Sequence, residues 1–233
     1  MSNLITINEF SRKFEEPRWS EKLQKYVSGG FEKEIEFRTA NVPQLIQDAV
    51  YQNQLRISDN YLLPENEKAL IAREVDEYSI LAVAANGYDD KCRPLIVYRY
   101  FWLENLSDPN FDGVGTLLQW WKEKQEPYCE IKPHQEYINE IEANGKKYYQ
   151  GQPYYKDHFK DYEEQTEEIF NQITEKPYIL KFLEKDGNII RPNHWGIHAL
   201  ALRLNRNYSN VDIAWTWNTS LIEGNCSRNC SPQ

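Results

Sequence analysis

Two histidines four residues apart are the first candidates for chemistry in this sequence. His194 and His198 stand in the segment HWGIH, where a helix would place both rings on one face, within reach of one metal ion. Such a site needs a third ligand from elsewhere, and the Glu that follows the first His of the zincin motif is replaced by Trp195. We therefore expect His194 to begin a helix and His198 to pack in the core, with no metal bound.

Carboxylates near one expected loop are the second candidates. Asp89 and Asp90, beside Lys91, would lie close to Glu74 and Asp76 at one end of a sheet. A metal-dependent nuclease would need such groups on adjoining strands, so that two ions lie beside a phosphate. Turn formation alone accounts for aspartates in a loop. A hydrolase of unknown class, metal-dependent or not, stays open as the alternative hypothesis, and its weak catalytic candidates are His194, His198, Asp89 and Arg93.

Other catalytic and cofactor motifs are missing from the sequence. There is no Gly-rich phosphate loop and no nucleophile elbow; Gly113-Val114-Gly115-Thr116 is only a fragment of the former, and it also suits the start of a helix. The four cysteines, at positions 92, 129, 226 and 230, lack zinc-site spacing. We expect no cofactor.

Charge and composition restrict the partners. The 233 residues carry a formal charge of −9, which repels phosphate backbones, so we expect no nucleic acid. Neither a secretory signal nor an apolar run of membrane-spanning length occurs, so we expect a soluble cytoplasmic protein without a membrane partner. The 16 Tyr, 9 Phe and 7 Trp must fill much of a core or line an interface.

The pattern of apolar residues predicts an α+β fold with a mixed, mainly antiparallel sheet. The clearest elements are two apolar strands, 78–85 and 95–104, which form a central hairpin over about 78–104 with helices packed on the sheet. We expect one domain over residues 1–223, followed by a disordered polar tail over 224–233. That tail favours a chain that is the front part of a longer protein, although a complete protein is the other possibility.

The spacing of apolar residues, together with the turn-forming residues between them, predicts further strands and helices. We expect strands at 31–38, 178–183, 189–190 and 211–217, with the middle two joined in a hairpin by an Asp-Gly turn. Helices are expected at 15–27, from 43 to about 55, and at 64–73, 114–125, 133–143, 154–173 and 193–204.

Aromatic residues offer a possible interaction surface. Consecutive tryptophans on one helix point in different directions, so Trp120 and Trp121 cannot both enter one core; one of them is exposed or lies against a neighbouring element. Aromatic rings are enriched at interface hot spots. The expected interaction residues are Trp120, Trp121, Trp102, Tyr98 and Tyr100. The alternative is a second packing surface inside the domain.

Three segments resemble a known family. Gln54-Leu55-Arg56-Ile57-Ser58, then Asp89 to Pro94, then Tyr98-Arg99-Tyr100-Phe101-Trp102-Leu103 are similar to the N-terminal module of bacterial GTPase-associated proteins. The resemblance covers roughly residues 45–120, with 194–218 as a later block. Tyr51-Gln52-Asn53-Gln54 stands where the family has Gly-Tyr-x-x-Gly-His, and no catalytic residue carries over.

The resemblance implies a functional class. Modules of this family are α+β units that face a small molecule or a partner, beside GTPases and caspase-like effectors in predicted conflict systems. We therefore expect a non-enzymatic protein-interaction or regulatory module with a protein partner, in a bacterial multi-protein system of the defence type.

Overall fold

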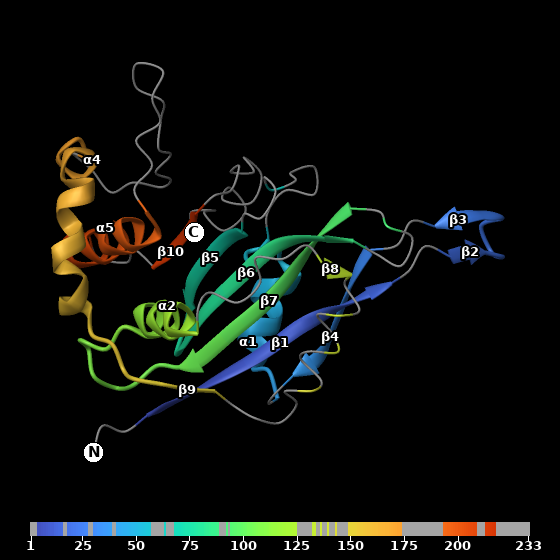
Figure 1. The fold of residues 1–233 in the computed structure, drawn as a ribbon, viewed down its shortest axis with the longest axis horizontal. Coiled ribbons are helices and arrows are strands. Elements are labelled where there is room, and N and C mark those ends of the chain that lie inside the picture. Colours follow the sequence, from blue (N-terminus) through green and yellow to red (C-terminus); the bar gives the residue numbers. More distant parts are fainter. Residues whose placement is uncertain are drawn as a thin grey trace, which may run out of the picture.

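The structure is a computed structural model, in which the described residues form ten strands, the two strands of the central hairpin among them (Figure 1). It describes residues 4–15, 18–27, 30–38, 41–56, 63, 68–88, 92, 94–124, 132–133, 136, 139, 143, 149–173, 193–208 and 213–217.

A mixed, mainly antiparallel sheet forms the body of the molecule, as the sequence predicts. Six strands lie in the order β10 (Ala214–Trp217), β5 (Lys68–Val75), β6 (Tyr78–Tyr88), β7 (Pro94–Glu104), β1 (Ile5–Glu15) and β4 (Gly30–Arg38), each antiparallel to its neighbour. Two short strands join this sheet, β8 (Lys132–Pro133) parallel to β6 and β9 (Tyr149–Gly151) antiparallel to β1. The α+β fold class is confirmed.

The predicted central hairpin is the best-paired part of the sheet. β6 and β7 run in register from Tyr78 opposite Glu104 to Tyr88 opposite Pro94. All side chains from Ser79 to Ala85 are buried, because both faces of the sheet are covered here. Burial on both faces requires a nearly continuous run of apolar residues, and this run made the hairpin predictable from the sequence.

Helices cover the two faces unequally. On one face lies α1 (Gln44–Tyr51), which buries Ile46, Ala49 and Val50 against a cluster that includes Ile80 and Tyr100. On the other lie α2 (Gly113–Glu123), the 3₁₀ helix η1 (Lys156–Thr166), α4 (Glu167–Asn171) and α5 (His194–Asn207) (Figure 1). None of the helices in the described ranges is long and apolar enough to cross a bilayer.

Side-chain caps set the starts of the two longest α-helices. The Asp112 carboxylate accepts a hydrogen bond from the Gly115 amide at the start of α2, and the Asn193 side chain accepts one from the Gly196 amide at the start of α5. Each cap satisfies an amide that has no partner within its helix. The predicted helices at 114–125 and 193–204 therefore begin within one residue of the observed ones.

Two predicted helices are wrong. Residues 68–75 of the expected helix 64–73 form strand β5, because eight residue pairs with β6 bury Ala69, Leu70, Ile71 and Ala72 on both faces, and this pairing overrides helix propensity. The expected helix 15–27 contains a hairpin instead, β2 (Arg18–Ser20) paired with β3 (Lys25–Val27). Gln24 in its turn has a φ of 50°, a left-handed conformation that a helix cannot contain.

A third helix differs in type. The expected helix 154–173 is mostly the 3₁₀ helix η1, followed by the five-residue α4. The predicted hairpin around 178–190 and the tail 224–233 lie outside the described residues, as does most of the expected helix 133–143.

Tyr100 lies within an aromatic stack on the α1 face. Its ring is 4.7 Å from that of Phe10 and 5.9 Å from that of Tyr98, with nearly parallel planes. Burial raises the pKa of Tyr100 from its ordinary value of 10.0 to about 12, although the nearby Arg12 guanidinium opposes the shift. The folded protein therefore holds this proton more tightly than the unfolded chain does.

The pKa of Tyr100 predicts a loss of stability in alkali. The stabilisation that comes from the neutral phenol is complete below pH 10 and is lost as pH rises toward 12, by an amount on the order of 2–3 kcal/mol. In Tyr100→Phe this part of the pH dependence should be absent. Urea unfolding at several pH values measures it, and identical alkaline slopes in the two proteins would contradict the assignment.

Two adjacent residues of α1 test which face of the helix packs on the sheet. Ile46 is fully buried, whereas Leu45 is 40% exposed. Ile46→Ala should lower the free energy of unfolding by about 2–5 kcal/mol, because it leaves a cavity. The matched control Leu45→Ala should change it by no more than about 0.5 kcal/mol. Equal losses in urea denaturation would show that α1 does not pack as described.

Candidate functional site

The structure places two of the four weak catalytic candidates. His194 is the first residue of α5 and is half-buried, and His198 lies one turn later and is fully buried. Asp89 and Arg93 lie outside the described residues. The expected positions of both histidines, at a helix start and in the core, agree with the structure.

Both ring nitrogens of His198 have a partner. Nε2 lies 2.8 Å from Asp112 Oδ2, and the Trp215 indole nitrogen lies 3.1 Å from Nδ1. An indole N–H can only donate, so Nδ1 must be the acceptor. The ring is therefore neutral with its proton on Nε2, which donates to the Asp112 carboxylate.

Asp112 joins this pair to the surrounding elements. Its second carboxylate oxygen caps α2 at the Gly115 amide, at 2.7 Å. Its backbone N–H donates to the Tyr154 carbonyl at 3.0 Å, and the Tyr154 amide in turn donates to the Thr116 hydroxyl at 2.9 Å. This group of residues, which we call the Asp112 network, ties α2, α5, β10 and the segment before η1 together.

Close packing at the Asp112 network explains the glycines of the phosphate-loop fragment. A Cβ on Gly115 would lie 2.5 Å from Asp112 Oδ2 and 2.5 Å from the Phe159 ring. A Cβ on Gly113 would lie 2.3 Å from the Ser79 hydroxyl. The two glycines thus allow the helix start to approach buried groups, a role that needs no phosphate.

The Asp112 network is built for structure more than for chemistry. His198 and Asp112 are both 0% exposed, and Phe159 packs edge-on against the His198 ring. His198 has no free nitrogen to face a substrate or a metal. Within the described ranges, no three His, Cys, Asp or Glu side chains are grouped so that they could hold a metal ion.

A second buried polar group was missed from the sequence. The Arg99 guanidinium on β7 is paired with the Glu9 carboxylate on β1, and the Tyr149 hydroxyl donates to the same carboxylate at 2.8 Å. Burial, together with the negative charge of Glu9, raises the pKa of Tyr149, so this hydroxyl keeps its proton. The signal was present in the sequence, because Arg99 is the only charged residue between Leu95 and Leu103.

The five predicted interaction residues are all in the core. Trp120, Trp121, Trp102, Tyr98 and Tyr100 have exposed fractions between 1% and 7%. Trp120 packs between Phe101 and Tyr149, while Trp121 faces His194. Both rings belong to one core cluster, so the prediction that they could not both enter one core is wrong: neighbouring elements cover two sides of α2. Because they are buried, these rings do not support an exposed interaction surface. They belong instead to packing surfaces inside the domain, which was the alternative.

Exposed apolar side chains occur instead on the β2–β3 hairpin, residues 18–27, which we call the arm. Trp19 is 49% exposed and Leu23, in the turn, is 56% exposed. The arm projects from the body of the molecule beyond the end of β1 (Figure 1). Sequence reasoning missed the arm because the strands are only three residues long; the paired aromatics Trp19 and Tyr26 on either side of a polar turn were the available signal.

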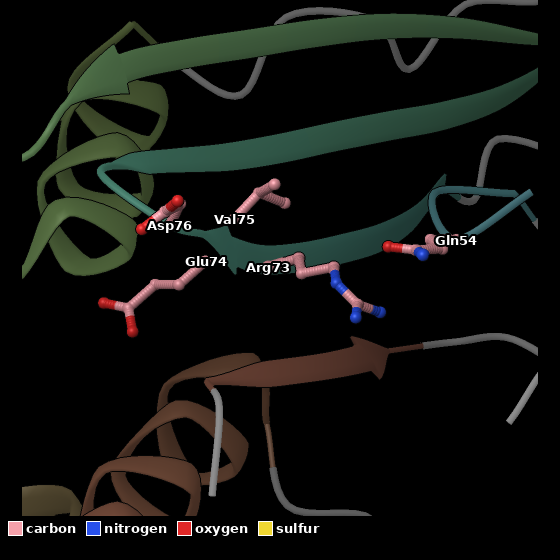
Figure 2. A pocket seen from close by; sticks show the side chains of 5 residues that line it. All are labelled: Gln54, Arg73, Glu74, Val75 and Asp76. Atoms are coloured by element: carbon pink, nitrogen blue, oxygen red, sulfur yellow. The ribbon is translucent and has the colours of Figure 1, made fainter. Parts of the chain in front are cut away.

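A shallow pocket lies at the far end of the sheet. It has a volume of about 300 Å³ and is lined by Gln54, Arg73, Glu74, Val75 and Asp76. Figure 2 shows Arg73, Glu74 and Val75 on β5, Asp76 in the following turn, and Gln54 approaching from the end of α1. The volume is at the lower end of the range for ligand sites, about 300–1,000 Å³, and suits a side chain better than a cofactor.

Comparison with known proteins finds no relatives: no family description, no curated protein and no solved structure matches this chain.

The contribution of the Trp215–His198 hydrogen bond to stability can be measured by comparison with a second buried tryptophan. Trp215→Phe would leave His198 Nδ1 buried without a donor, which costs about 1–3 kcal/mol of folding stability beyond the loss of ring volume. Trp120→Phe is the matched control, because the Trp120 indole nitrogen is buried without a hydrogen-bond partner among the described residues. Urea denaturation compares the two, and similar losses would contradict the assigned tautomer.

Proposed function

We propose that this chain is a non-enzymatic protein-interaction module that contacts its partner through the arm. The observation that carries the proposal is the Trp19 ring, which is 49% exposed on a projecting hairpin. The other described tryptophans are less exposed. Tryptophan is among the most enriched residues at interface hot spots. Exposed Trp and Leu side chains on one hairpin can stabilise a complex more than they stabilise the isolated chain.

The charge of the arm indicates the chemistry of the partner. The arm contains Arg18, Lys22 and Lys25 but only one acidic residue, Glu21, so its formal charge is +2. Because the whole chain carries −9, the remainder carries −11. A basic hairpin with an aromatic side chain suits a partner surface that offers an apolar recess surrounded by carboxylates.

The resemblance to the modules of GTPase-associated proteins supports the same proposal. Such modules act beside other proteins, so a contact element is expected of this chain in a multi-protein system. The hydrolase alternative loses one of its candidates, since both ring nitrogens of His198 are occupied by Asp112 and Trp215.

Binding assays with two variants test the proposal. Trp19→Ala should weaken the complex with a purified partner by about 30-fold, the effect of losing a hot spot of about 2 kcal/mol. Leu106→Ala is the control, because Leu106 is 45% exposed but lies on the loop before α2. The partner is first identified by comparing what the wild type and the two variants capture from the native cells. If no captured protein depends on Trp19, the proposal fails.

A further inference from the structure

The arm and the pocket lie at opposite ends of the sheet. The arm follows the C-terminal end of β1, whereas the pocket adjoins the turn between β5 and β6. The strand register confirms this separation: Tyr78, which follows the turn, pairs with Glu104, and the neighbouring Trp102 pairs with Asn8, near the start of β1. Figure 1 shows the same arrangement, with β2 and β3 far from the start of β6.

Carboxylates lie in the lining of the pocket and close to it. Glu74 and Asp76 line it, Glu77 is exposed in the same turn, and Glu104 lies opposite Tyr78. Partial burial, together with the charges of Glu77, Glu104 and Asp76, raises the pKa of Tyr78, as a negative local potential should. We call these four carboxylates, at positions 74, 76, 77 and 104, the acidic rim.

The pocket itself has features that suit an aromatic side chain. Val75 contributes an apolar wall, and the Arg73 guanidinium extends from the same strand (Figure 2). A guanidinium can stack on the face of an indole ring, and tryptophan is the best acceptor of this contact. The pocket therefore offers a place for one indole, within a rim that attracts basic residues.

We propose that the pocket binds the arm of a second copy of this chain, with Trp19 in the pocket and Lys22 and Lys25 beside the acidic rim. The inference rests on the proposed function, in which the arm is the contact element, and it names the partner. Both complementary surfaces are present in one chain. Two copies that lie side by side in opposite directions bring each arm to the other copy's pocket, which closes the assembly as a two-fold dimer.

The attraction between nearby charges outweighs the net repulsion between two acidic chains in this association. At physiological ionic strength, exposed charges more than about 8 Å apart are largely screened. The +2 arm therefore responds to the nearby acidic rim far more than to the −9 of the whole partner. The dimer in which the arm contacts the acidic rim is therefore favoured over other arrangements of the same two chains.

The decisive experiment is a charge exchange on the full chain. Lys22→Glu on the arm and Glu77→Lys on the rim each place like charges together, so each should weaken dimerisation by about 10-fold or more. The two changes combined restore opposite charges and should recover most of the affinity. Lys124→Glu, at the end of α2, is the control for a reversed exposed lysine and should leave dimerisation unchanged. Sedimentation equilibrium over a range of concentrations measures all of these proteins, and thermal unfolding confirms that each is folded.

The outcomes separate this inference from the proposed function. A dimer that is weakened by each single change and recovered by the double change supports the inference. A wild-type chain that stays monomeric overturns it, and so does a dimer that is indifferent to both changes. A monomer that captures a different protein through Trp19 overturns the homodimer and leaves the interaction module standing. A monomer with no Trp19-dependent partner overturns both.

Discussion

The burial of β6 on both faces is the constraint on which the rest of the structure depends. Ile80, Ala82 and Ala84 point to the α1 side, and Leu81 and Val83 point to the side of α2 and α5. A strand without a polar face is stable only when two layers cover it. The helices are placed accordingly, and β5 and β7 shield its two edges through long antiparallel registers.

Two of the buried polar side chains, His198 and Glu9, are satisfied in different ways. His198 lies between a carboxylate and an indole, and Glu9 lies between a guanidinium and a phenol. Buried polar groups are costly unless they are hydrogen-bonded, so each group fixes the relative positions of the elements that supply it. This accounts for His198, which looks catalytic in the sequence and has a structural role in the fold.

The fold also distributes charge in a way that composition conceals. A net charge of −9 describes an acidic protein, yet the arm carries +2 at one end and the acidic rim lies at the other. Net charge governs solubility and long-range steering, whereas contact specificity follows the local distribution. Because the predicted aromatic rings are buried, the proposed partner contacts lie at the arm and the pocket.

Short-range patterns determined the central hairpin, the helix starts at α2 and α5, and the α+β class, because two-sided burial and capping leave their signs within a few neighbouring residues. Tertiary structure decided the rest. The segment from Lys68 to Val75 is a strand because β6 and β10 pair with it, and no local signal encodes those partners. The contact between His198 and Asp112 joins residues 86 positions apart. The burial of Trp120 and Trp121 depends on β9 and α5 closing over two sides of one helix, and long-range packing of this kind cannot be read from sequence spacing.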